Sequence, residues 1–78
     1  MQAYVIRVYL EDGSWAYARN EGYGQVQVYL TEDVGSAICF RTTREATDYF
    51  NRYIKNKYDS RSGLRVNNDR TCLIEVEY

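Results

Sequence analysis

Two pairs of adjacent acidic residues are the first candidates for chemistry in this sequence, because both stand in segments typical of turns. The pairs are Glu11-Asp12 and Glu32-Asp33. If the strands run up and down in order, the two turns lie at the same end of the sheet and bring all these carboxylates together. Such a cluster could bind a cation, or imitate nucleic-acid phosphates toward a basic partner. The competing interpretation is that Lys55 and Lys57, returned to this edge by a helix, only screen the acids.

Tyrosine is strongly over-represented, with nine residues against two phenylalanines and one tryptophan. A chain of 78 residues cannot bury all of them in one core, so several must lie at the surface. Tyrosine and arginine anchor many protein interfaces, because a tyrosine buries a large area while it loses few rotatable bonds. For any single tyrosine, the simpler explanation is that it replaces phenylalanine as half-buried filler.

Because successive side chains of a strand point to opposite faces, some of these tyrosines should point away from the expected core. Tyr9 and Tyr29 should project from the same side of neighbouring strands, together with Arg7, Gln25 and Gln27. This side and the acidic turns form the predicted partner-binding set: Arg7, Tyr9, Gln27, Tyr29, Glu11, Asp12, Glu32 and Asp33.

Positive charge is concentrated between residues 52 and 70, although the chain as a whole has a net charge of −1. The basic residues of this region are Arg52, Lys55, Lys57, Arg61, Arg65 and Arg70, against the acids Asp59 and Asp69. With Tyr53 and Tyr58 nearby, they have the minimum equipment for phosphate contact and base stacking. No known RNA-binding motif accompanies them, so a solvated surface is the competing interpretation and direct nucleic-acid binding is the less favoured function.

Catalytic chemistry has little support in this composition. The chain has no histidine, which removes the commonest general base and metal ligand. Glu75 and Glu77 share one face of a strand, but charged residues on an edge strand normally prevent aggregation. No motif indicates a cofactor, and two cysteines cannot complete a four-sulfur zinc site. We therefore expect a chain that is not an enzyme and that needs neither metal nor cofactor.

The two cysteines, Cys39 and Cys72, stand outside any CxxC spacing and are expected to be buried free thiols; a disulfide between them is the alternative. The N-terminal segment enters an alternating strand pattern without a basic and then apolar leader, and no segment is long and apolar enough for a membrane. These features favour a reducing cytosol.

A β-hairpin is predicted at the N-terminus. Residues 4–10 alternate, and Asp12-Gly13 suits a two-residue type I′ turn. That turn would place Leu10 opposite Trp15 and Val8 opposite Tyr17, so that these aromatic residues share the core-facing side. Ala16 and Ala18 would then lie on the other side, with Arg7 and Tyr9.

Two further strands are expected over residues 25–30 and 36–41, with a helical turn over residues 34–38 as the alternative to the latter. Thr42 and Glu45 match a capping box, so a helix should begin there and end near Tyr58. Its expected apolar face consists of Ala46, Tyr49, Phe50, Tyr53 and Ile54. Residues 64–66 and 70–78 could form a final hairpin, with Cys72, Ile74, Val76 and Tyr78 on one face.

The predicted fold is therefore a single α+β domain over residues 1–78. Its order is ββββαβ, and an antiparallel β-sheet of four to five strands packs against one α-helix.

Four segments carry, in their order, a resemblance to small phage and prophage accessory proteins: residues 4–6, Tyr-Val-Ile; residues 37–40, Ala-Ile-Cys-Phe; residues 42–46, Thr-Thr-Arg-Glu-Ala; and residues 73–77, Leu-Ile-Glu-Val-Glu. In size and in its lack of enzymatic residues, the chain also resembles the anti-CRISPR class. The resemblance implies a stoichiometric inhibitor in the bacterial host cytosol. Its partner would be a larger bacterial protein or protein–nucleic acid complex, such as a CRISPR effector or nuclease.

Two other functions remain open from the sequence. One is a nucleic-acid-binding accessory protein that uses the basic region of residues 52–70. The other is a homodimeric structural or adaptor protein, which would explain surface tyrosines equally well.

Overall fold

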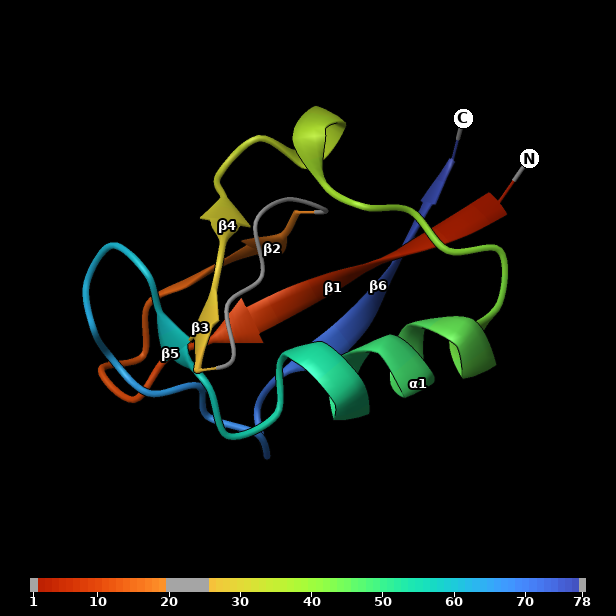
Figure 1. Ribbon diagram of the computed structural model, residues 1–78. Coiled ribbons are helices and arrows are strands. Elements are labelled where there is room, and N and C mark those ends of the chain that lie inside the picture. The colour runs from red at the N-terminus through yellow and green to blue at the C-terminus, as the bar shows by residue number, and fades with distance from the viewer. Residues whose placement is uncertain (1, 20–25, 78) are drawn as a thin grey trace.

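The computed structural model describes residues 2–19 and 26–77, which form a four-stranded antiparallel sheet with one α-helix packed on it (Figure 1). The α+β class and the sheet-plus-helix architecture are confirmed. In chain order the elements are β1 (Gln2–Tyr9), β2 (Trp15–Ala18), β3 (Gln27–Val28), β4 (Leu30–Thr31), the 3-10 turn η1 (Val34–Ser36), α1 (Thr43–Tyr53), β5 (Tyr58–Asp59) and β6 (Cys72–Glu77).

The order of strands in the sheet is β4-β2-β1-β6, so β1, β2 and β4 run up and down in chain order as expected from the sequence. The last strand returns to pair with the first, and β1 becomes central. β1 is the longest strand and has buried residues on both faces, Val5 on one and Ile6 on the other. β2 and β6 pair with its two edges.

The segment expected as one strand over residues 25–30 divides at Tyr29, and Gln25 lies outside the described residues. β4 pairs with β2, whereas β3 pairs in parallel with β5 in a separate two-stranded sheet. Val28 and Leu30 are buried as expected, but Val26 is exposed.

No strand forms over residues 36–41; the alternative, a helical turn, is confirmed by η1. Asp33 caps this turn, because its carboxylate accepts the N–H of Gly35 at 2.9 Å and the hydroxyl of Ser36 at 3.0 Å. Beyond it, Phe40 pairs with Tyr4 through two backbone hydrogen bonds of 2.8 Å. Residues 37–40 therefore cover the edge of β1 beyond the end of β2.

The hairpin between β1 and β2 differs from the prediction by one residue. Leu10 donates its N–H to the carbonyl of Ser14 at 2.8 Å, and Gly13 has a φ of 88°. The connection is thus a three-residue loop that ends on a left-handed glycine, rather than a two-residue turn. Arg7 pairs with Tyr17, and Tyr9 with Trp15. This shift moves every side chain of β2 to the opposite face from the one predicted.

The core lies between the sheet and α1. Helix formation begins as predicted, because the Thr42 hydroxyl accepts the N–H of Glu45 at 3.1 Å. Ala46 and Ile54 are fully buried, and Phe50 packs against them. Tyr53, predicted on the apolar face, is 42% exposed. The helix ends at Tyr53 rather than near Tyr58, and Asn56 adopts a left-handed φ of 64° in the turn that follows.

The final hairpin of the sequence prediction does not form. Val66 instead bridges to Leu10, and Arg65 bridges to Tyr58, so the segment after β5 lies beside the β1–β2 loop. β6 pairs with β1 along its whole length, with Cys72, Ile74 and Val76 on one face as predicted. Tyr78 lies outside the described residues.

Candidate partner-binding surface

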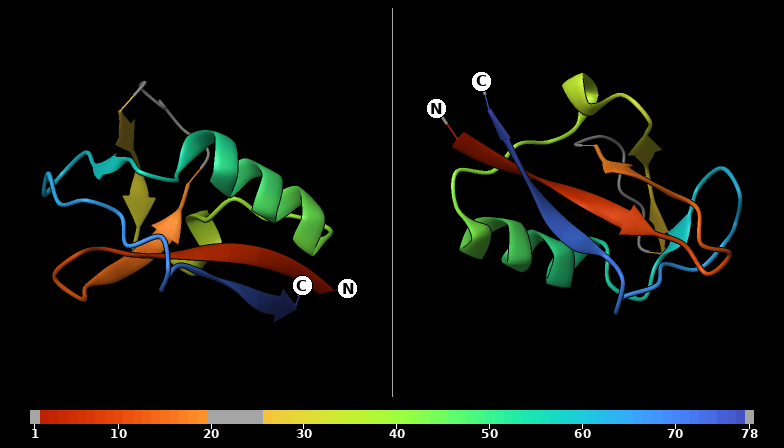
Figure 2. Two further views of the ribbon diagram at one scale, coloured as in Figure 1. Left: turned by 90° about the horizontal axis from the view of Figure 1, so that it is seen from below. Right: turned by 180° about the vertical axis from the view of Figure 1, so that it is seen from behind.

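One face of the four-stranded sheet packs on α1, and in the described part of the chain no helix covers the other face (Figure 2, right). We call the uncovered side the outer face. The strand register places these residues on it: Ala3, Val5, Arg7, Tyr9, Trp15, Tyr17, Cys72, Ile74 and Val76. None of these is acidic, because the acids of β6 alternate to the other side, where Glu75 pairs with Tyr4.

Aromatic rings and arginines gather at one end of the outer face. The ring centroids of Tyr9 and Trp15 are 6.4 Å apart, and those of Trp15 and Tyr17 are 5.3 Å apart in an edge-to-face arrangement. The guanidinium carbon of Arg7 lies 4.2 Å from the centroid of Trp15. Arg70 covers Tyr9 in the same way, at 4.5 Å. We call these five residues the aromatic–arginine cluster.

Arg70 reaches the cluster because the loop before β6 is fastened to the end of β1. The N–H of Asn67 donates to the carbonyl of Tyr9 at 2.7 Å. The N–H of Tyr9 donates to the hydroxyl of Thr71 at 3.2 Å, and the N–H of Arg70 donates to the side-chain oxygen of Asn67 at 3.3 Å. These bonds hold the backbone on both sides of Arg70 against the strand.

Two tyrosines neighbour the guanidinium of Arg7. Hydrogen bonding to Tyr17, and secondarily to Tyr9, raises the pKa of the Arg7 guanidinium above its ordinary value. Its Nε atom is buried and has no hydrogen-bond partner among the described residues. Stacking on Trp15 orients the guanidinium, and Trp15 remains 42% exposed beside it.

An apolar strip extends from the cluster along β1 and β6. Val5 is 0% exposed and Ala3 is 2% exposed, although both lie on the outer face and neither belongs to the main core. Ile74 and Val76 flank them on β6 and are half-buried. Val5 and Ala3 offer no surface to a partner, so the accessible part of the outer face consists of half-buried Ile74 and Val76, the aromatic rings and the arginines. Aromatic residues and arginine are enriched at interface centres.

The predicted sheet residues are only partly brought together. Arg7 and Tyr9 lie in the cluster. Tyr29 accepts the N–H of Arg19 at 3.2 Å, which places it opposite Arg19 and away from the Tyr9 end of the hairpin. Gln27 is exposed in the separate β3–β5 pair.

The predicted acidic residues mostly serve the backbone of the turns. Glu11 accepts the N–H of Arg65 at 3.2 Å, and Asp33 caps η1. Asp12 accepts both the N–H and the hydroxyl of Ser14, and these bonds lower the pKa of its carboxyl below the ordinary 3.8. Of the four acids, Asp12 and Glu32 line one cleft on the other side of the sheet.

The basic region does not form a single patch. Arg70 lies in the cluster, and Arg61 lines the cleft. Arg52 stands near the end of α1, beside Tyr49 and Tyr53 in a shallow depression. Arg65 bridges to Tyr58; Lys55 and Lys57 follow the end of the helix instead of continuing it.

Trp15 and Tyr17 were not predicted as surface residues, and Arg70 was predicted in the basic region of residues 52–70 rather than beside Tyr9. The small side chains of Ala16 and Ala18 are compatible with the core side of a strand, but the assumed turn type assigned them to the other side. The contact of Arg70 with Tyr9 could not be predicted, because it depends on the path of a distant loop.

Other predictions about chemistry are partly corrected. Cys39 and Cys72 are free thiols, but both are exposed rather than buried. Among residues 2–19 and 26–77, no group of three or more acidic, cysteine or histidine side chains is arranged to hold a metal ion. Within the same ranges, no helix has the length and apolar character needed to cross a membrane.

Comparison of the chain with family models, with curated proteins and with solved structures gives no significant match.

Proposed function

We propose that this protein is a stoichiometric binding protein that inhibits a larger protein by covering one of its functional surfaces with the outer face. The observation that carries the proposal is the aromatic–arginine cluster: exposed or half-buried rings and oriented guanidinium groups on a sheet face that no helix of the described residues covers. Binding, rather than catalysis, is the function that such a surface performs.

The size of the molecule supports this mode of action. A specific interface needs about 800 Å² from each partner. The protein exposes 5076 Å² in all, so one such interface would occupy a substantial share of its surface. The rings of the outer face are already held by the strands, so binding through them needs no rearrangement of the backbone.

The charge of the outer face defines the partner's side of the contact. Arg7 and Arg70 are the charged members of the cluster, so the complementary surface should be acidic. The resemblance to phage accessory proteins makes a CRISPR effector or defence nuclease the first target to test, in the bacterial host cytosol. Exposed free thiols are compatible with that reducing compartment.

The test is capture of the target and inhibition of its activity by variants of the outer face. We expect Trp15→Ala together with Tyr17→Ala to abolish capture from a lysate that contains CRISPR effectors, and to abolish inhibition of the captured enzyme. Tyr53→Ala is the matched control, because Tyr53 is as exposed as Trp15 but lies on α1. Equal capture by both variants would reject the outer face as the binding surface.

A second candidate function is nucleic-acid binding, which the stacking of arginines on aromatic rings favours. On this alternative, affinity for single-stranded DNA or RNA falls steeply with salt, with about one counterion released for each phosphate contact. Arg70→Gln would then reduce the salt dependence. Absence of binding at low salt would reject nucleic-acid binding. The remaining possibility, a homodimeric structural or adaptor protein, is tested by native mass spectrometry, which separates monomer from dimer.

A further inference from the structure

The edge of β6 that faces away from β1 is open to a further strand. β6 stands at one end of the sheet order β4-β2-β1-β6. Among residues 2–19 and 26–77, the backbone hydrogen bonds of Cys72–Glu77 run only to β1. We call this side of β6 the free edge. Such an edge presents unpaired N–H and C=O groups, which an extended segment of another chain can satisfy.

The hydrogen bonds of β1 show which residues of β6 face the free edge. Tyr4 exchanges two backbone bonds of 2.8 Å with Phe40, on the side of β1 away from β6. Successive residues of a strand direct their N–H and C=O groups to opposite sides, so Val5 bonds toward β6, where it pairs with Ile74. Ile74 therefore bonds to β1, and the residues that direct these groups to the free edge are Leu73, Glu75 and Glu77.

A small apolar cavity lies between the free edge and α1. It has a volume of about 180 Å³, and its lining consists of Ile6, Thr47, Phe50, Thr71, Cys72 and Leu73. Leu73 belongs to β6, whereas Thr47 and Phe50 belong to α1. A cavity of about 150 Å³ with an apolar lining accepts a molecule of benzene. One branched apolar side chain therefore fits here.

An added strand would place alternate side chains over this cavity and over the acids of β6. Leu73, Glu75 and Glu77 face the α1 side of the sheet, so the residues opposite them point to that side as well. The residue opposite Leu73 reaches the cavity, and those opposite Glu75 and Glu77 meet exposed carboxylates. The segment that fits is apolar at the first of these positions and basic at the other two.

A second copy of this chain lacks the complementary pattern, because β6 contains no basic residue. Antiparallel pairing of two β6 strands centred on Glu75 places this residue opposite its own counterpart, and like charges directly opposite one another are destabilising. Pairing centred on Ile74 instead places Glu75 of each copy over the apolar cavity of the other. The free edge thus favours a strand of opposite charge.

We propose that the free edge and the cavity form a docking groove for an extended segment of a partner protein. The segment pairs antiparallel with β6, inserts an apolar side chain beside Leu73, and sets basic side chains against Glu75 and Glu77. Main-chain hydrogen bonds supply affinity, while the cavity and the acids supply specificity. The docking groove uses the edge of the sheet, so it does not depend on the function proposed for the outer face.

The probe is an end-blocked peptide, Thr-Lys-Val-Lys-Val-Leu-Thr, whose lysines and leucine match Glu77, Glu75 and Leu73 in antiparallel order. Hydrogen–deuterium exchange of the ¹⁵N-labelled full chain gives the readout. Saturation with peptide should slow exchange at Leu73 and Glu75 by about tenfold or more, and change it little at Ile74, whose N–H already bonds to β1. Equal slowing at all three amides, or none, would overturn the proposal. Slowing at Leu73 and Glu75 on concentration of the protein alone would identify a second copy as the occupant and overturn it as well.

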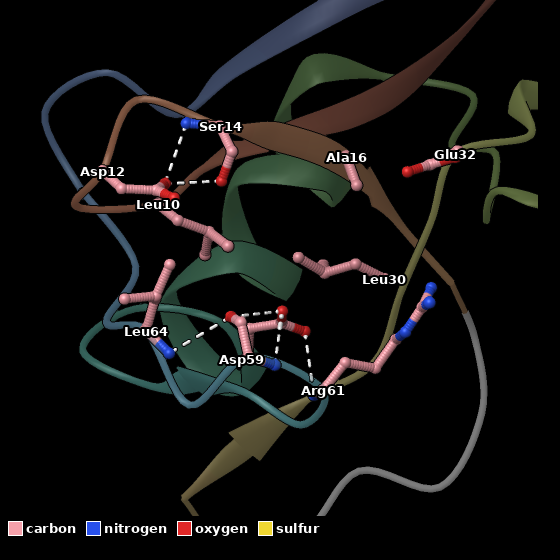
Figure 3. A pocket seen from close by; sticks show the side chains of 10 residues that line it. Leu10, Asp12, Ser14, Ala16, Leu30, Glu32, Asp59, Arg61 and Leu64 are labelled. Atoms are coloured by element: carbon pink, nitrogen blue, oxygen red, sulfur yellow. Dashed lines mark hydrogen bonds between the residues drawn. The ribbon is translucent and has the colours of Figure 1, made fainter.

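The cleft lined by Asp12, Glu32 and Arg61 is an internal control, because it shares no lining residue with the cavity. Asp12 and Glu32 stand at opposite ends of its edge, and the guanidinium of Arg61 lies on the Glu32 side (Figure 3). The peptide should leave the amide resonances of Ser14 and Ser62 unshifted. Shifts there as large as those in β6 would show unselective binding to acidic surface and reject the docking groove.

Matched changes in the peptide and in α1 test the two parts of the docking groove. N-methylation of the second lysine removes the N–H that would bond to Glu75, and should weaken binding about tenfold. The control is methylation of the second valine, whose N–H points away from β6. Thr47→Phe fills the cavity and should also weaken binding about tenfold, whereas Asp48→Phe, exposed on α1 outside the lining, should not. Equal affinities within the peptide pair would reject strand addition, and equal affinities within the variant pair would reject the cavity.

Discussion

The guanidinium of Arg7 stacks on the indole ring of Trp15, 4.2 Å from guanidinium carbon to ring centroid, and neither residue belongs to the hydrophobic core. The contact exists because Arg7 pairs with Tyr17 and Tyr9 pairs with Trp15 across the β1–β2 hairpin. With a register one residue different, Trp15 would face α1. The surface that we propose for binding is thus a consequence of the hairpin register.

The register is tested by introducing a lysine on each side of β2. Ala18 is 0% exposed, so Ala18→Lys should reduce the free energy of unfolding by about 3 kcal/mol or more, because it forces a charge into the core. Trp15→Lys should cost about 1 kcal/mol. Urea denaturation measures both. The opposite ranking would show that the two-residue turn predicted from the sequence is correct after all.

Gly13 is required by the three-residue loop that fixes this register. Its φ of 88° is in the left-handed region, while the nearest atom to an added Cβ would be Arg70 Nη1 at 4.0 Å. Gly13→Ala should therefore destabilise the protein through backbone strain alone, by about 1 kcal/mol. The midpoint of urea unfolding provides the measurement. A stability equal to that of the parent protein would contradict the left-handed conformation.

The stacking of Arg70 on Tyr9 should contribute measurably to stability. In a double-mutant cycle of Arg70→Met and Tyr9→Leu, we expect a coupling free energy of about 0.5 kcal/mol, the value for exposed cation–π pairs. The same cycle between Arg70 and Tyr53, which lies on α1, should give none. If both cycles give the same coupling, Arg70 does not rest on Tyr9 in solution.

Asp12 should titrate below its ordinary pKa of 3.8, chiefly because the Ser14 hydroxyl donates to its carboxylate. A lowered pKa in the folded state means that the ionised turn stabilises the protein above about pH 4. This contribution is lost as the pH falls through the folded-state value. Carboxyl ¹³C NMR should show that Ser14→Ala raises the pKa of Asp12 toward 3.8. The control is Ser36→Ala, which removes the hydroxyl that donates to Asp33. A similar rise in the pKa of Asp12 in that variant would exclude the Ser14 hydroxyl as the cause.

The N-terminal cap of α1 is the last feature that we put to a test. Thr42→Ala removes the acceptor of the Glu45 N–H and should cost about 1 kcal/mol of unfolding free energy. Thr43→Ala is the control, because Thr43 lies in the first turn of the helix and is exposed. Thermal denaturation of the two variants gives the comparison. A larger loss for Thr43→Ala would mean that the helix begins elsewhere.

Features that depend on residues close together in the sequence were predictable. The alternation of β1, the cap at Thr42 and the buried positions Ala46 and Ile54 all follow from local spacing, and all are present in the structure. Of the aromatic–arginine cluster, only Arg7 and Tyr9 were predicted on the binding face; they belong to β1, whose faces were assigned correctly.

The remaining part of the site could not be derived from local patterns. Asp12-Gly13 is compatible with either a two-residue or a three-residue connection, because a glycine with positive φ serves in both. The length of the connection depends on which face of β2 packs in the core: the face with the small Ala16 and Ala18, or the face with the large Trp15 and Tyr17. Pairing of β6 with β1, and the seating of Arg70 on Tyr9, likewise join residues far apart in the chain. Local conformational preference sets the strands and the helix, whereas packing of distant segments sets the surface that they present.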